Sequence, residues 1–298
     1  MTSTQRAYLE LHLAVFLFGF TAILGDLIQL SALLIVWWRV LLTSLSLAFI
    51  VRVVRLFRNL PWQKTLKFMG IGVIVAVHWV TFYGAIKLSN ASIGVIAMAT
   101  TSFFTSLLEP LIMRQKVKWY ELMLGLLIVP GMALIVNSTD LSMLTGLGVG
   151  LLSALLAALF AILNKKLITH SDERSITFLE MSSACLFLTI VIPVYSWMTD
   201  TPLSIIPPTL VDLGYLVILA LVCTTFAYVL ALRSLQHLSA FASNLSINLE
   251  PVYGILLAWV LLNENEELDT GFYVGAGIIV VAVFSYPLLK RRFDKGPT

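Results

Sequence analysis

The sequence has little charge, few cysteines and no nucleotide-binding motif. Asp, Glu, Lys and Arg make up 12% of its 298 residues, about half the share found in soluble domains. Its two cysteines, Cys185 and Cys223, lie in apolar runs and form no CxxC pair, so neither a disulfide framework nor a zinc site is expected. The pattern GxxxxGK[ST] is absent, which argues against direct use of ATP. No tract is basic enough to indicate nucleic-acid binding, and no cofactor or metal is expected.

The sequence also lacks the residue patterns of an intramembrane enzyme. Such enzymes need Ser/His, paired Asp or HExxH arrangements within their spans, and none is found. His78 is the one histidine expected deep within a span. We therefore predict a protein that is not an enzyme.

What the sequence has in abundance is apolar surface. Hydrophobic residues make up 59% of the chain and the mean hydropathy is +0.95, values typical of a polytopic membrane protein. The runs are continuous rather than alternating, so they predict an all-α integral membrane fold with ten transmembrane helices and not a β-barrel. The expected spans are 8–25, 33–51, 66–87, 91–113, 119–137, 146–166, 175–198, 213–233, 239–262 and 271–289. The first resembles a signal peptide, but no convincing cleavage site follows it, so we expect it to be retained.

The basic residues are distributed unevenly among the expected loops. Nearly all Lys and Arg fall on the side that holds both termini, and Lys87 alone is expected at the opposite surface. Cytoplasmic loops are enriched in Lys and Arg, so we predict a multi-pass protein of the cell (inner) membrane with both termini in the cytoplasm. Arg39 falls within the second span rather than in a loop.

Ten spans divide into two halves of five, residues 1–140 and 141–298. Aligning Ala91 with Ala240 sets Thr101 opposite Glu250. Because each half has an odd number of spans, the two halves cross the membrane in opposite directions. The sequence therefore predicts a 5+5 inverted-topology repeat, with a substrate site near the midplane between the halves.

The most unusual polar residues lie in the stretch from Ser239 to Glu264. Glu250 falls near the middle of an expected span, where a charged side chain costs roughly 2.5–3.5 kcal/mol on insertion scales. Such residues usually face a cavity or a partner, so we expect Glu250 to bind substrate or a proton, with Asn244 and Asn248 as polar contacts. A structural carboxylate that caps a helix end, or a salt bridge to Arg39, is the alternative.

Three further polar residues are expected near the same depth. Arg39 lies inside its span, so a buried ion pair or a clamp for a substrate carboxylate is expected there. His78 can titrate near neutrality and is expected at the cavity, although a lone histidine on an apolar helix is often just hydrogen-bonded to a neighbour. Thr101 is the counterpart of Glu250 in the other half.

Aromatic side chains near these positions can line a cavity suited to flat or apolar substrates, although most aromatics in membrane proteins serve packing or the interfacial belt. The candidates are Trp79, Tyr83, Phe160 and Tyr228. Glu109 and Glu180 lie close to the basic ends of their spans, and we expect both to snorkel toward the surface.

The segment ALRSLQHLSAFASNLSINLEPVYGILLAWVLLNE from Ala231, with VWWRVLLTSLSLAFI in the second span, resembles the EamA-type family of the drug/metabolite transporter superfamily. The likeness covers nearly the whole chain. It departs at TTSFF around Thr101, which replaces the family's usual Ser-Pro. The resemblance implies ten helices, a central cavity and export of metabolites or amino acids. His78, Trp79 and Tyr83 are similar to residues of members that export aromatic amino acids.

These features predict a secondary transporter, an exporter of small metabolites or amino acids, that works by alternating access. An uncoupled facilitator or channel-like permease, and a multidrug or nucleotide-sugar carrier of the same superfamily, are the alternatives. The expected partners are a small-molecule substrate and the lipid bilayer, with no nucleic acid. Coupling to protons and the oligomeric state stay open.

Overall fold

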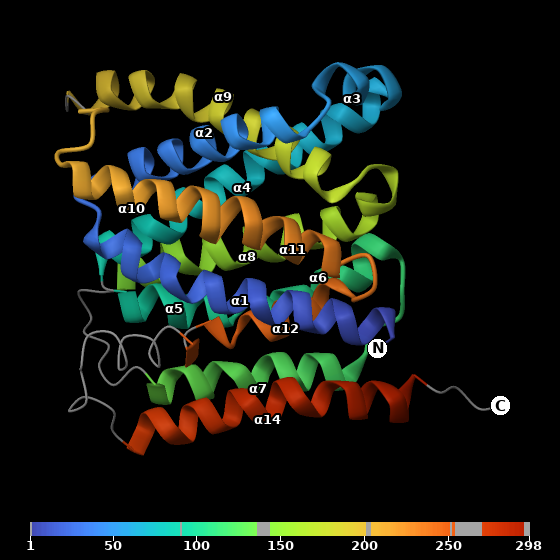
Figure 1. Ribbon diagram of the computed structural model, residues 1–298. Coiled ribbons are helices and arrows are strands. Elements are labelled where there is room, and N and C mark those ends of the chain that lie inside the picture. The colour runs from blue at the N-terminus through green and yellow to red at the C-terminus, as the bar shows by residue number, and fades with distance from the viewer. Residues whose placement is uncertain are drawn as a thin grey trace.

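The computed structural model describes residues 2–89, 91–135, 144–200, 204–250, 252–253 and 270–294. Helices and turns make up these residues and no strand occurs among them, which confirms the all-α class. The elements are α1 (Ser3–Leu27), α2 (Ala32–Ile50), α3 (Val53–Asn59), α4 (Trp62–Leu88), α5 (Ala91–Ala99), α6 (Thr101–Met113), α7 (Trp119–Ile135), α8 (Leu144–Leu167), η2 (Ile168–His170), α9 (Glu173–Thr199), α10 (Leu210–Ala220), η3 (Leu221–Phe226), α11 (Ala227–Ser234), α12 (Ala240–Ile247) and α14 (Thr270–Phe293). The start of α1 and the end of α14 lie at the same end of the bundle (Figure 1).

Seven helices in the described residues are long and apolar enough to cross a membrane. They cover Ser3–Gly25, Ala32–Ile50, Trp62–Leu88, Leu144–His170, Glu173–Thr199, Leu210–Ser234 and Tyr273–Phe293. The expected span 91–113 is instead divided at Thr100 into α5 and α6, and the expected span 239–262 begins as α12 and then leaves the described residues. The helix α7 is apolar but shorter. The described residues therefore show a multi-pass fold with seven long apolar helices, and the predicted count of ten is not tested by them.

A short helix that the apolar pattern does not predict joins the second and third spans. The helix α3 is too short to cross a bilayer. Leu56 and Leu60 lie one turn apart and are both buried against the main core cluster. The remaining residues of α3 face outward, so the helix lies at one end of the bundle (Figure 1).

The span Leu210–Ser234 contains a π-helical turn at η3. The hydroxyl of Thr224 donates to the carbonyl of Leu219 at 2.7 Å, and that of Thr225 donates to the carbonyl of Ala220 at 2.9 Å. Side-chain hydrogen bonds of this kind replace part of the regular backbone ladder and widen the turn. The wider turn presents the Thr224 hydroxyl to α2, where it meets the candidate site.

The central layer of the bundle is α4, which packs against α8 on one side and α9 on the other. Small residues allow this close approach, because a Cβ at Gly72 would overlap the backbone oxygen of Glu180 and the hydroxyl of Ser183. At the edge of the bundle, α7 of the first half lies beside α14 of the second (Figure 1).

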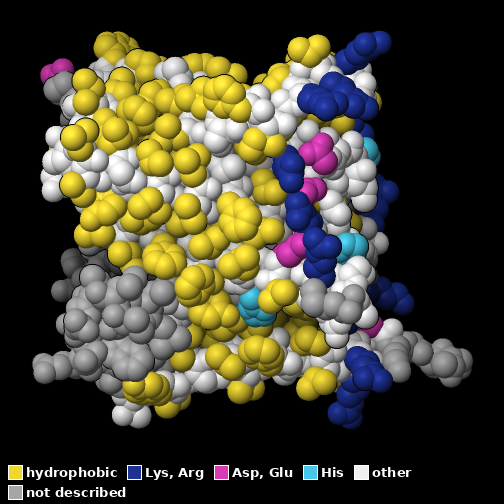
Figure 2. Space-filling view, in the orientation of Figure 1, with side chains coloured by type: hydrophobic (Ala, Val, Ile, Leu, Met, Phe, Trp, Pro, Cys, Tyr) yellow, Lys and Arg dark blue, Asp and Glu magenta, His cyan; other side chains and the backbone are white. Residues whose placement is uncertain are grey.

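The outer surface is apolar over most of the length of the helices. Figure 2 shows hydrophobic side chains across the face of the bundle, whereas Lys and Arg gather at one end. Arg52, Arg58 and Arg291 are among the exposed residues there. We call this the basic end; it also holds the start of α1 and the end of α14.

Candidate functional site

A cavity of about 130 Å³ lies inside the bundle, between helices of the two halves. Its wall is built by side chains from α1, α2, α4, α5, α6, α7, α8, α11 and α12, and by Glu250 after α12. Nine of the ten residues selected from the sequence line it, namely Arg39, His78, Trp79, Thr101, Phe160, Tyr228, Asn244, Asn248 and Glu250. The tenth, Tyr83, is not part of the wall but contacts Arg39 through its hydroxyl. The structure thus brings the selected residues together, and their roles in binding stay predictions.

Arg39 is a buried cation, with 4% of its surface exposed. Its Nε donates to the Thr224 hydroxyl at 2.5 Å, and its Nη1 donates to the Tyr83 hydroxyl at 3.3 Å. The guanidinium also lies over the ring of Trp79, with Cζ 3.9 Å from the ring centroid, a cation–π contact. None of the ion pairs formed by the described residues includes Arg39. The guanidinium is therefore held in place by neutral groups.

Glu250 lies on the same cavity wall and is partly buried. The Thr21 hydroxyl donates to its Oε1 over 3.4 Å, which is a long contact. Although Glu250 and Arg39 are both described, no ion pair joins them, so the salt-bridge alternative is not realised in this conformation. The cavity thus holds an acidic and a basic group that face the same space without pairing.

His78 is fixed to α8 by a reciprocal pair of contacts. Its Nδ1 lies 3.0 Å from the carbonyl oxygen of Ser153, and the Ser153 hydroxyl donates to the carbonyl of His78 at 2.8 Å. The Ser153 hydroxyl also lies 2.8 Å from Nδ1. Because that hydroxyl donates to the carbonyl of His78 and the Ser153 carbonyl can only accept, we assign the ring proton to Nδ1. The ring also packs against Phe160, with centroids 5.4 Å apart. His78 lines the cavity, and its hydrogen bonds show the packing role that a lone histidine usually has.

The polar residues of α6 and α12 pair with each other across the two halves. Nδ2 of Asn244 donates to the Thr105 hydroxyl at 2.8 Å, and Nδ2 of Asn248 donates to the Ser102 hydroxyl at 3.1 Å. The Thr101 hydroxyl is buried and has no partner among the described residues. Other atoms of Thr101 line the cavity, whereas its hydroxyl oxygen is buried among neighbouring groups.

Glu180 does not snorkel as expected. Its carboxylate is fully buried between α8, α9 and α11, where it accepts a 2.6 Å hydrogen bond from Tyr228 and a 3.4 Å contact from Nδ2 of Asn164. The prediction is wrong because these two polar side chains offer partners inside the bundle. Asn164 and Tyr228 are themselves polar residues inside apolar runs, which is the signal that could have indicated the contact.

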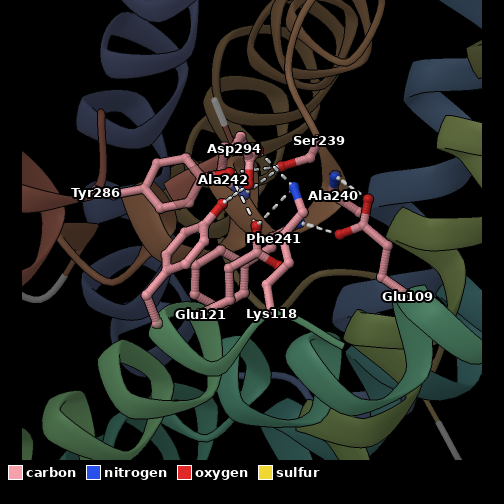
Figure 3. A network of polar contacts seen from close by, with 10 residues as sticks. Glu109, Lys118, Glu121, Ser239, Ala240, Phe241, Ala242, Tyr286 and Asp294 are labelled. Atoms are coloured by element: carbon pink, nitrogen blue, oxygen red, sulfur yellow. Dashed lines mark hydrogen bonds and ion pairs between the residues drawn. The ribbon is translucent and has the colours of Figure 1, made fainter. Parts of the chain in front are cut away.

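Glu109 is the second carboxylate that does not snorkel. It is 7% exposed, and its two oxygens accept the backbone N–H groups of Ala240 and Phe241, at 3.1 and 2.7 Å, at the start of α12 (Figure 3). The first N–H groups of a helix have no partner within it and attract a negative charge. Glu109 therefore caps α12, the helix that carries Asn244.

A neighbouring network joins α7 and α14 at the basic end (Figure 3). Tyr286 donates to Glu121 at 3.2 Å, and Lys118 pairs with Asp294 at 2.8 Å.

Among the described residues, no three side chains of His, Cys, Asp or Glu lie close enough together to hold a metal ion.

Comparisons with known proteins agree with this architecture. The model of the EamA-like transporter family matches the chain twice, over residues 5–137 and 144–286. A solved structure described only as the crystal structure of a protein superposes with a TM-score of 0.77 at 13% identity, covering 97% of this chain and 99% of the other, which is a likeness of fold. No curated protein matches the chain in sequence. With both halves matched and seven helices able to cross a membrane, the chain is a multi-pass membrane protein that belongs to the EamA-like transporter family of the drug/metabolite transporter superfamily.

Proposed function

We propose that the protein is a secondary transporter that exports a small zwitterion, an amino acid, through the cavity between its halves. The carrying observation is that Arg39 and Glu250 line one cavity without pairing. A buried guanidinium without a counter-ion is costly, and a substrate carboxylate would offset that cost through bidentate hydrogen bonds. Glu250 is then the acceptor for the substrate ammonium group.

The rest of the wall favours an amino acid with an aromatic or large apolar side chain. Phe160 and Tyr228 pack with ring centroids 6.4 Å apart, and Trp79 meets Tyr228 edge-on at 6.2 Å. Flat apolar groups pack well against such rings.

Alternating access between the two halves is the proposed mechanism. The halves are residues 1–140 and 141–298, arranged as a 5+5 inverted repeat of ten spans with both termini in the cytoplasm of a cell with an inner membrane. The family match over 5–137 and 144–286 supports two halves. The gathering of Lys and Arg at the end that holds the start of α1 and the end of α14 supports the orientation. The two halves then rock around the cavity to expose it to one side at a time.

A thermal-shift panel on the purified protein tests the proposed ligand. A ligand that binds the folded state raises the melting temperature by mass action, so aromatic amino acids should stabilise the wild type, whereas the same side chains without the carboxylate or the amine should not. Glu250→Gln should lose the response. The matched control is Glu121→Gln, which removes a buried carboxylate outside the cavity and should keep it. Equal responses in the two variants would contradict the proposed site.

A transport assay separates the proposal from its alternatives. We further propose proton coupling as the driving force, so proteoliposomes that hold the stabilising amino acid at equal concentrations inside and outside should accumulate it on one side when a pH gradient is imposed. An uncoupled facilitator would only equilibrate it. Stabilisation by organic cations or by nucleotide sugars, with no response to amino acids, would favour the multidrug or nucleotide-sugar carriers instead.

A further inference from the structure

A hollow of about 430 Å³ opens at the basic end, away from the cavity described above. It lies between α3 and the connection from η2 to α9, and its wall includes Arg52, Arg55 and Arg174. A second hollow beside α3 shares Arg52 and Arg55 and adds Arg58. The arginines of this short helix are thus concentrated around concave surface.

These arginines have no counter-ion among the described residues, whereas two other cations at the same end are paired. Lys118 pairs with Asp294, and Arg233 pairs with Glu173. Within the described chain, no ion pair includes Arg52, Arg55 or Arg174. Membrane proteins generally carry an excess of basic residues in their cytoplasmic loops. That general bias does not explain why unpaired arginines surround a hollow.

The remaining polar groups on the wall do not neutralise the arginines. Asp172 is the acidic residue there among the described residues, and its Oδ1 accepts the backbone N–H of Ser175 at 3.0 Å, where it caps α9. Nε2 of His170 accepts a hydrogen bond from Nζ of Lys64 at 2.8 Å, which brings another cation to the rim. The hollow therefore carries a net positive charge.

The hollow also has an apolar border where the span Ala32–Ile50 ends. Ile50 and Val51 form part of its wall. Phe49 and Val54, which flank them, are 91% and 85% exposed. A soluble phosphate has no apolar part that could contact this border. A phospholipid can place its phosphate among the guanidinium groups and its acyl chains along these side chains.

We propose that this hollow binds the headgroup of an anionic phospholipid from the leaflet at the basic end. The phosphate accepts hydrogen bonds from Arg52 and Arg55, and Arg174 adds charge from the start of α9. The lipid then bridges α3 in the first half and α9 in the second. This inference is independent of the transported substrate.

The test compares lipids and variants on the full-length protein in a neutral detergent. Phosphatidylglycerol should raise the melting temperature of the wild type, and native mass spectrometry should show it retained, whereas phosphatidylcholine should do neither. Arg52→Ser with Arg55→Ser should weaken retention by about 25-fold, or about fivefold for each cation. The matched control, Arg291→Ser with Arg292→Ser, removes the same charge at the same end and should retain the lipid.

Each of the following results would overturn the proposal. Equal loss in the two double variants would show that only the diffuse charge of the basic end matters. An equal response to phosphatidylcholine would remove the role of the anionic group. Full competition by soluble glycerol phosphate would make the hollow a site for free phosphate instead. If the double variant does not fold, Arg55→Lys is tested in its place, because it keeps the charge but loses the planar guanidinium. Unchanged lipid retention in that variant would also contradict the proposal.

Discussion

The hydroxyl of Tyr228 donates a hydrogen bond of 2.6 Å to Oε2 of Glu180, a residue with no exposed surface. Tyr228 lines the cavity and Glu180 lies behind it. Nδ2 of Asn164 lies 3.4 Å from the same carboxylate oxygen, whereas Oε1 has no partner among the described residues. One wall of the cavity is therefore held by a buried carboxyl group that joins α8, α9 and α11.

Removing the Tyr228 hydroxyl should destabilise the protein. Tyr228→Phe leaves Oε2 with the long contact from Asn164, which should cost roughly 1–3 kcal/mol for a buried group deprived of its partner. Glu180→Gln keeps an oxygen that can accept from Tyr228 and removes a buried charge, so it should melt no lower than the wild type. Thermal unfolding of the purified variants checks both. A Tyr228→Phe variant that melts like the wild type would show that the hydrogen bond contributes little.

The cap on α12 predicts a graded series at Glu109. Glu109→Ala leaves the N–H groups of Ala240 and Phe241 without their acceptor, and should cost roughly 1–3 kcal/mol. Glu109→Gln retains one acceptor oxygen and should fall between Ala and the wild type. Because α12 carries Asn244 on the cavity wall, Glu109→Ala should also reduce the thermal shift caused by an amino-acid ligand. If Gln and Ala are equally destabilising, the charge rather than the hydrogen bonds stabilises the helix start.

The sequence allows the membrane class and nine residues of the cavity wall to be predicted, because both depend on residues that are unusual in their surroundings. Arg39, Glu250 and Asn248 are polar residues within apolar runs, and the penalty for exposing them to lipid directs them inward. Aligning the two halves places Thr101 at the same depth, and the structure puts it on the same wall.

The partners of these residues could not be predicted in the same way. Glu109 and Glu180 lie near span ends. At such positions the local sequence of a glutamate that snorkels to the surface is nearly the same as that of one that is buried. The outcome depends on groups brought in by distant helices, such as Tyr228 and the start of α12. The short helix α3 also depends on tertiary packing, since its seven residues carry too weak a periodic pattern to stand out.

Because Arg39 has no counter-ion among the described residues, we expect its substitution to affect stability and ligand binding differently. Arg39→Met removes a buried charge that has no counter-ion, so the ligand-free protein should melt at or above the wild-type temperature. The same variant should no longer be stabilised by the amino acid. Arg39→Lys keeps the charge but loses the paired donors of the planar guanidinium, so it should bind the amino acid at least tenfold more weakly. Melting curves with and without the ligand measure both effects. An Arg39→Met variant that keeps its ligand response would exclude Arg39 as the carboxylate clamp.

The Lys118–Asp294 pair at the basic end predicts a pH dependence. Burial acts to raise the pKa of Asp294, but the hydrogen bond from Lys118 and its charge outweigh that effect, so the pKa lies below 3.8. Burial acts to lower the pKa of Lys118, yet Asp294 and Glu121 raise it above 10.5. The contribution of Asp294 is therefore present above about pH 4 and is lost as the pH falls through its folded pKa. That of Lys118 is present below about pH 10 and is lost as the pH rises through its folded pKa.

Asp294→Asn should therefore lower the melting temperature slightly at pH 7 and have less effect below pH 4. The loss at pH 7 should stay under about 1 kcal/mol, because both side chains are about a third exposed and are screened by salt. A double-mutant cycle with Lys118→Met, measured by thermal unfolding at low and high salt, isolates the pair from the hydrogen bond that Tyr120 donates to Asp294 at 2.8 Å. A coupling near zero at both salt concentrations would show that the ion pair contributes nothing and that the tyrosine holds Asp294 in place.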